Sequence, residues 1–421
     1  REVTASDFKY SCERAADPAT GSKTADTYLG DIVGVKENLE GAADEISGVK
    51  VLDDYTLEIT IDAPKAYFLS KLAYPTAFVV DKANVESGED WWQEPNGSGP
   101  FMLKEWQKEE LLILERNDDY YLDPPRIGYV VARLWAGVPM QMYENDEIDL
   151  TWVYTGDIER VLDPSNPLNK ELVTESTLTL AYIGFDVTSP PFDDPKVRQA
   201  FAHAIDKDKI IELVYKDMVL RADGILPPDM PGYNEDLQGL TYDVVRAKEL
   251  IAESKYTDVA NLPPIILTSA GWGTVSALDA ALADMWRQNL GVEVEIRQLE
   301  PDVYFNVIKE EKDELFSDGW GADYPDPQNF LDVLFHSDTE QNTGEYSNAE
   351  VDSLLERARV EQNDAARMSL YRQAEQLITS DAAIIPLYFD ESYMLVKPYV
   401  KDLPATPLWI PRFKYVSIEP H

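Results

Sequence analysis

Residues 318–331 combine the residue types that a ligand-binding loop needs. Their sequence, DGWGADYPDPQNFL, places two glycines around a tryptophan, followed by acids and two prolines. Glycine lets a backbone approach a ligand closely, proline fixes the course of a loop, and Trp320 and Tyr324 can supply rigid faces. The alternative is a rigid connection from a strand to a helix, in which Asp323 caps a helix that begins near Pro327. These residues alone leave both interpretations open.

Metal ligation and nucleophilic catalysis find little support in the sequence. The three histidines, His203, His336 and His421, are far apart and stand in no metal-binding spacing. The GxSxG, Walker and GxGxxG motifs do not occur. Cys12 is the one cysteine, has no histidine near it in the sequence, and is expected to be a buried, inert thiol. We therefore expect no metal, no cofactor and no catalytic residue.

The strongly negative net charge argues against nucleic-acid partners and makes pairs of carboxylates uninformative. The chain carries 78 acidic and 37 basic residues, a net charge of −41, which repels phosphate backbones, so no nucleic-acid partner is expected. We expect most of this acidity to form a solubilising surface. In so acidic a chain any two carboxylates can be imagined as the dyad of a glycoside hydrolase, so such pairs carry no specific signal.

Alternating apolar residues predict two β-hairpins in the early part of the chain. Residues 49–61 alternate around Asp53, and residues 99–117 alternate around a polar turn at 107–110. The region near 50–130 is therefore expected to be mostly β-structure with connecting helices.

Helical spacing appears later in the chain. Asp194 and Pro195 form a helix start, and apolar residues follow at helical spacing as far as Ile210. A second helix is expected from Ser276 to Leu290, stopped by Gly291, with a strand at 292–296. The other elements expected here are helices at 351–359 and 365–378 and a short buried strand at 383–389. Helices that alternate with strands predict α/β layers.

Chain length and hydropathy set the overall organisation. A chain of 421 residues exceeds the size of one compact core, so two or three domains are expected. No run of about 18 apolar residues occurs. The sequence opens on Arg1 within an ordered-looking pattern, and we expect a chain trimmed at its start.

The segment at 319–331 resembles the cleft motif of the oligopeptide- and dipeptide-binding proteins of ABC importers, which are extracellular solute-binding proteins of family 5. Further stretches resemble landmarks of that family in the same order, and together they cover about Val3 to about Val396. These stretches are VTASDFKYS at 3–11, VKVLDDYTLEITIDAP at 49–64, NGSGPFMLKEW at 96–106, ERNDDYY at 115–121, IGFDVTSPPFDDPKVRQAFAHAIDKDKI at 183–210, LGVEVEIRQLE at 290–300, EYSNAEVDSLL at 345–355 and AEQLITSDAAIIPLYF at 374–389.

The resemblance implies an α/β fold of the periplasmic-binding-protein type II, in which two large lobes close over a cleft beside a third lobe. It assigns residues 1–50 to a remnant of the extra lobe, residues 51–155 and 395–421 to an incomplete first lobe, and residues 156–394 to the second, C-terminal lobe. On that map the opening strands of the first lobe and most of the extra lobe are absent from this chain.

The resemblance also implies roles for individual residues. Asp323 takes the position whose carboxylate binds a peptide's α-ammonium, and Trp320 takes the position whose ring lines the pocket. Gly319 and Gly321 are expected to let the backbone pair with the main chain of the ligand, as in strand addition. The other residues expected in the site are Ala322, Tyr324 and Trp272.

One part of the family pattern is missing. In well-known relatives, basic side chains receive a peptide's C-terminal carboxylate. Here Lys309 stands near one such position, and the positions where a basic residue is expected hold Ile308, Ser317 and Val275. The anchoring of a ligand carboxylate, and with it ligand length, is left open. Trp272 is expected either to line a side-chain pocket or to pack within its glycine-rich turn.

The function implied by the resemblance is the capture of oligopeptides outside the cytoplasm and their delivery to ABC permease subunits. We expect a monomer without enzymatic activity, either free in the periplasm or held at the cell surface as a lipoprotein. One alternative keeps the fold but changes the ligand to an oligosaccharide or another small solute. Aromatic residues suited to sugar stacking are Trp152, Tyr154, Trp272, Trp320 and Tyr324. The other alternative is an acidic glycoside hydrolase, which requires two carboxylates roughly 5–9.5 Å apart.

Overall fold

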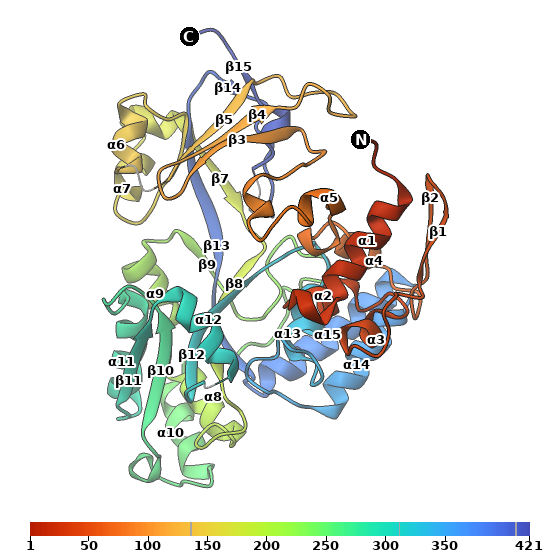
Figure 1. The fold of residues 1–421 in the computed structure, drawn as a ribbon. Coiled ribbons are helices and arrows are strands. Elements are labelled where there is room, and N and C mark those ends of the chain that lie inside the picture. The colour runs from red at the N-terminus through yellow and green to blue at the C-terminus, as the bar shows by residue number, and fades with distance from the viewer. Residues whose placement is uncertain (135–136, 311, 409–410) are drawn as a thin grey trace. The chain divides into compact units, whose positions relative to one another are not determined.

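The computed structural model describes residues 1–134, 137–310, 312–408 and 411–421, and the chain divides into two compact units (Figure 1). The first unit comprises Arg1–Glu175 and Ser392–His421, and the second comprises Ser176–Glu391. The chain therefore passes from one unit to the other twice. The three-lobe division expected from the sequence, with its boundaries, stays a prediction. Within the described ranges, no helix combines the length and the apolar character needed to cross a membrane.

A mixed β-sheet forms the centre of the second unit. Its strands lie in the order β11 (Val294–Leu299), β10 (Ile265–Ala270), β12 (Leu315–Gly321), β8 (Thr179–Phe185) and β13 (Ile384–Val396). β10 runs parallel to β11 and β12, whereas β8 is antiparallel to both β12 and β13. A short strand, β9 (Val219–Arg221), also pairs with β13. Figure 1 shows β10, β11 and β12 side by side.

Helices surround this sheet and confirm the expected α/β layering. They are α8 (Pro195–His203), α9 (Lys207–Ile210), α10 (Val244–Glu253), α11 (Ala277–Asn289), α12 (Pro301–Glu310), α13 (Gln328–Phe335), α14 (Ala349–Val360) and α15 (Asp364–Ser380). A row of aromatic side chains joins sheet to helices, because Phe185, Phe192, Phe201 and Trp286 contact one another in sequence at ring-centroid distances of 4.7, 5.0 and 5.3 Å. All four rings are fully buried.

Local signals explain several helix ends in the second unit. The Ser276 hydroxyl accepts the backbone N–H of Asp279 at 3.0 Å to start α11, and Gly291 follows that helix in the left-handed conformation at φ 78°, as predicted. The single helix expected as far as Ile210 was wrong. α8 ends at His203, and Asp206 starts a new short helix by accepting the backbone N–H of Lys209.

The strand expected at 383–389 is part of a much longer element. β13 has 13 residues and continues to Val396, where its last residues pair with β6 (Leu150–Trp152) in the first unit. Burial of its first residues was predicted correctly. The continuation reads DESYMLV and begins with three polar residues, so a search for a fully buried strand stops too early.

The first unit contains the predicted hairpins, β1 (Val49–Asp53) with β2 (Thr56–Ile59), and β3 (Phe101–Gln107) with β4 (Leu111–Arg116). Strand β5 (Tyr129–Arg133) extends the second hairpin. The remaining elements are α1 (Ala5–Ala16), α2 (Ala25–Leu29), α3 (Val35–Leu39), α4 (Phe68–Lys71), α5 (Lys82–Val85), α6 (Pro139–Glu144), α7 (Ile158–Leu162), β7 (Leu172–Ser176), β14 (Val400–Lys401) and β15 (Ser417–Ile418).

A small core holds α1, α3 and the first hairpin together. It includes Ala16, Ile32, Val35 and Val49, each 1% exposed or less. Cys12 belongs to the same core, and burial raises the pKa of its thiol to about 11. The expectation of a buried cysteine is confirmed, and a thiol with a pKa this high carries almost no thiolate at neutral pH.

Candidate functional site

The predicted site segment begins on β12. This strand pairs with β8 along its whole length, with Gly319 opposite Ala181, but it pairs with β10 only at Leu315 and Phe316. Among the described strands, none pairs with residues 317–321 on the side away from β8. Main-chain groups on such an edge can accept an added strand.

Asn329 is the central polar residue behind the site. It lies on α13, is fully buried, and its Nδ2 donates a hydrogen bond to Oδ2 of Asp323 at 3.1 Å. Its Oδ1 accepts from the backbone N–H of Asp323 at 3.0 Å and from Nε1 of Trp320 at 3.3 Å. One buried amide therefore orients the two side chains that the sequence ranked highest as ligand contacts. Sequence reasoning missed Asn329, although the residue lies within the quoted motif.

Tyr324 is placed differently from the other predicted contacts. It is 1% exposed, and its hydroxyl donates to Oε1 of Gln328. Nε2 of Gln328 donates to Asp332 at 3.0 Å, and Asp332 accepts two bonds from Nε and one from Nη2 of Arg359, at 2.7 to 3.1 Å. In this arrangement Tyr324 anchors the loop to α13 and α14. Its role as a ligand contact stays a prediction.

The alternative helix-capping role of Asp323 is not what the structure shows. Pro327 stands at the start of α13, and Oδ1 of Asp326 accepts the backbone N–H of Gln328 at 3.0 Å. Both carboxylate oxygens of Asp326 also accept from Nη1 of Arg367, at 3.0 and 2.9 Å. Asp326 therefore performs the capping, and the carboxylate of Asp323 accepts from the side chain of Asn329.

The two predicted glycines differ in how much room surrounds them. A Cβ at Gly319 would lie 3.1 Å from the carbonyl oxygen of Leu180, whereas a Cβ at Gly321 would make an ordinary contact of 3.5 Å with Thr179. Both glycines are exposed, and the next residue, Ala322, donates its backbone N–H to Leu178 at 2.8 Å. Gly319 is therefore the position where the close approach of two strands favours glycine.

Trp272 lies on the loop that follows β10. It is 74% exposed, and Gly273 beside it has φ 86°. Because β10 and β12 run parallel, this loop and Gly321 leave the sheet at the same edge. Ligands of α/β proteins commonly bind at the carboxyl ends of such strands. No contact of Trp272 with the segment at 319–324 is established, so its role in the site stays a prediction.

A carboxylate stands in the middle of β12, next to Ser317, where a basic residue was expected. Asp318 precedes Gly319, accepts its backbone N–H at 2.8 Å, and accepts the hydroxyl of Tyr182 at 3.4 Å from the opposing strand. Desolvation raises the pKa of Asp318 to about 6, although both hydrogen bonds act in the opposite direction. Side chains of residues two apart on a strand share a face, so Asp318 and Trp320 lie on the same face of β12. The alternation of side chains along a strand was the sequence signal that could have placed Asp318 beside Trp320.

The positions considered for a basic anchor are now located. Ile308 is 2% exposed, Val275 is 46% exposed, and the carbonyl oxygen of Ser317 accepts the hydroxyl of Tyr304. Lys309 donates to Oε1 of Gln341 at 3.2 Å.

Within the residues that the structure describes, no group of three His, Cys, Asp or Glu side chains has a geometry that could hold a metal ion.

The sequence and the fold both match known proteins. The family model of bacterial extracellular solute-binding proteins, family 5 Middle, matches residues 1–342. The periplasmic oligopeptide-binding protein OppA of Escherichia coli is 31% identical over 417 residues, which span 94% of this chain and 75% of that protein. The probable deoxycholate-binding periplasmic protein YgiS of the same organism is 31% identical over 416 residues, spanning 96% and 76%.

Among solved structures, the murein tripeptide-binding protein MppA of Escherichia coli superposes with a TM-score of 0.87 at 27% identity, and the match covers 100% of this chain and 84% of that one. The periplasmic-binding-protein fold expected from the sequence is thereby confirmed. By sequence and by fold, the chain belongs to the bacterial extracellular solute-binding proteins of family 5.

Proposed function

We propose that the solute captured by this protein is an oligopeptide and that its free N-terminus binds at Asp323. The observation that carries the proposal is the carboxylate of Asp323, held by the buried amide of Asn329 beside the ring of Trp320. A carboxylate that is oriented before the ligand arrives forms a strong, charge-assisted bond with an α-ammonium group.

The backbone around Gly319 supports the same proposal. No described strand pairs with residues 319–321 on the side away from β8, so an extended peptide can form main-chain bonds there, whereas the carbonyl oxygen of Ser317 already accepts the hydroxyl of Tyr304. Such bonds do not read side chains, which suits a protein that accepts many sequences. A relative 31% identical to this chain carries the name of an oligopeptide-binding protein.

The proposed partners follow from the family. Solute-binding proteins of importers hand their ligand to permease subunits, so we propose an ABC permease as the protein partner. We propose a monomer without catalytic turnover, located outside the cytoplasm either free or as a lipoprotein, and with no nucleic-acid partner, since the net charge of −41 repels phosphate.

A second ligand class has one observation in its favour. A relative of equal identity, 31%, is named as a probable deoxycholate-binding protein. Native mass spectrometry of the protein purified from cells distinguishes the classes. Co-purified peptides of mixed sequence support the proposal, whereas one defined non-peptide mass overturns it.

A further inference from the structure

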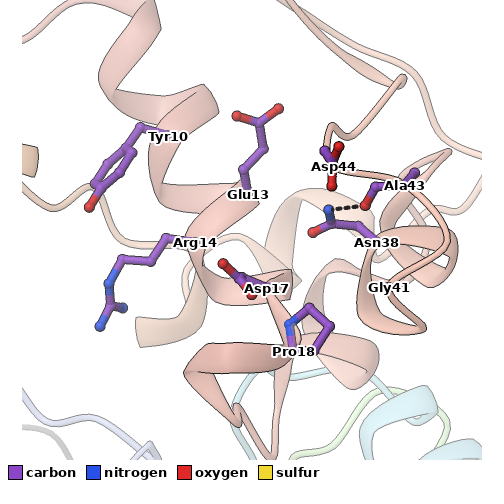
Figure 2. A pocket seen from close by; sticks show the side chains of 9 residues that line it. All are labelled: Tyr10, Glu13, Arg14, Asp17, Pro18, Asn38, Gly41, Ala43 and Asp44. Atoms are coloured by element: carbon purple, nitrogen blue, oxygen red, sulfur yellow. Dashed lines mark hydrogen bonds between the residues drawn. The ribbon is translucent and has the colours of Figure 1, made fainter.

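The first unit contains a pocket of about 560 Å³ beside α1. Tyr10, Glu13 and Arg14 line it from α1, Asp17 from the residue that follows that helix, Asn38 from α3, and Asp44 from the loop after α3 (Figure 2). None of these residues is among those proposed to bind the peptide, which belong to the second unit.

Asn38 is the residue in this pocket whose side-chain oxygen has no hydrogen-bond partner among the described residues. It is 4% exposed, and its Nδ2 donates to the carbonyl oxygen of Ala43 at 2.7 Å, which fixes the orientation of the amide. Its Oδ1 is buried and accepts no hydrogen bond from the described residues. Figure 2 shows this oxygen turned toward the side of the pocket where Glu13 and Asp17 lie. A buried acceptor without a donor costs about 1–3 kcal/mol, so a ligand that donates an N–H there is favoured.

The charges around Asn38 favour a positively charged ligand. Three carboxylates line the pocket, those of Glu13, Asp17 and Asp44, against one guanidinium. Arg14 lies over the ring of Trp91 at 5.3 Å and, in Figure 2, points away from Asn38 and Asp44. Carboxylates cannot donate to the oxygen of Asn38, whereas a protonated primary amine has three N–H donors, enough for that oxygen and two of the carboxylates.

Two of the carboxylates already have partial partners. Glu13 lies 3.5 Å from Nζ of Lys9, and Oδ1 of Asp17 accepts the backbone N–H of Ala19 at 2.8 Å. Asp44 is exposed at the rim. The described residues contain no cluster with metal-ligand geometry.

We propose that this pocket binds a small organic cation that bears N–H donors, of the alkylamine or guanidine class. The donor groups lie between Oδ1 of Asn38 and the carboxylates of Asp17 and Asp44, and the ring of Tyr10 contributes to the opposite wall. The proposal does not rest on peptide binding at Asp323.

The test uses the full chain at fixed ionic strength, with the monocations ethanolamine and methylguanidine as probes. Choline is the comparison cation, because it carries the same charge and the same hydroxyl as ethanolamine but has no N–H donor. Isothermal titration gives the affinity, and hydrogen–deuterium exchange locates the site through protection at residues 10–18 and 37–45. We expect ethanolamine or methylguanidine to bind at least about tenfold more tightly than choline, because choline has no N–H to donate to Asn38.

Variants that remove charges distinguish binding in the pocket from non-specific attraction of cations to the acidic chain. The double variant D17N/D44N removes two lining carboxylates, and Asn at position 17 can still cap the following turn. The control E37Q/E40Q removes two exposed carboxylates of α3 and its end that do not line the pocket. We expect D17N/D44N to weaken the binding of the probe at least about tenfold and E37Q/E40Q to change it less than about twofold. Equal loss in both variants, equal affinity for choline, or binding of neither probe overturns the proposal.

Discussion

The carboxylate of Asp323 is held by the side chain of Asn329. The amide donates to Oδ2 at 3.1 Å and accepts from the backbone N–H of the same aspartate at 3.0 Å, so both the side chain and the loop of Asp323 depend on one residue of α13. Because Asn329 is fully buried, the geometry is set by the fold rather than by the ligand. A pre-oriented carboxylate lowers the entropy cost of binding.

Replacing Asn329 by alanine should weaken ligand binding through Asp323. Asn329→Ala removes one donor from the carboxylate of Asp323 and the acceptor of the indole of Trp320, and we expect peptide affinity to fall about tenfold. Calorimetry with a peptide selected from a library measures this loss. Asn289→Ala is the matched control, because Asn289 donates to the carbonyl oxygen of Ala204 on another face of the second unit. Affinity that falls equally in both variants would point to general destabilisation.

The ion pair between Asp332 and Arg359 should carry much of the stability of α13. Asp332 is 2% exposed, so Arg359→Gln leaves a buried carboxylate without its cation. We expect the free energy of unfolding to fall by about 3 kcal/mol, the low end for a broken buried pair, because the side chain of Arg359 is itself 27% exposed. Urea unfolding gives the difference. Arg357→Gln, on the exposed face of the same helix, should change stability by less than about 0.5 kcal/mol; equal effects would contradict the assignment.

Glu375 should make stability fall as pH rises. It is 1% exposed on α15, its Oε1 accepts the backbone N–H groups of Ile225 and Leu226, and burial raises its pKa from 4.5 to about 7. The folded protein therefore keeps a proton that the unfolded chain releases above pH 4.5. Its contribution is complete below pH 4.5 and is lost as pH rises through 7, by up to about 1.4 kcal/mol for each pH unit in that window.

The variant Glu375→Gln keeps the accepting Oε1 but has no proton to lose. Urea unfolding at pH 5, 6, 7 and 8 measures the free energy of unfolding of both proteins. As pH rises, the value for the variant should increase by about 1–3 kcal/mol relative to that of the unmodified protein. Glu340→Gln, an exposed position, serves as the control and should follow the unmodified protein. Parallel curves for Glu375→Gln and the unmodified protein would show that Glu375 does not titrate in this range.

Local signals in the sequence predicted much of the fold. The hairpin at 49–61 and the helix from Ser276 to Gly291 depend on alternation, capping and a left-handed glycine, which neighbouring residues determine. The break between α8 and α9 was missed because helical spacing continues through it, while Asp206 supplies a second helix start that periodicity does not reveal. The length of β13 was missed because its end pairs with β6, a partner far away in the sequence.

The candidate site was predicted only in part, for a different reason. The motif at 318–331 indicates which residues gather, but not which of them turn toward solvent. Tyr324 and Trp320 are both aromatic, yet the hydroxyl of Tyr324 bonds to Gln328 inside the unit. The importance of Asn329 and of Asp318 depends on partners, Asp323 and Tyr182, whose proximity only the folded chain establishes.

The central claim, that Asp323 receives the α-ammonium of a peptide, is tested most directly by removing each charge in turn. One peptide is titrated in two forms, with a free and with an acetylated N-terminus, against the unmodified protein and against Asp323→Asn. The four affinities form a double-mutant cycle. We predict that acetylation weakens binding to the unmodified protein at least about a hundredfold, and binding to Asp323→Asn by less than about tenfold, since breaking a buried pair costs about 3–5 kcal/mol. Equal effects of acetylation on both proteins would contradict the account.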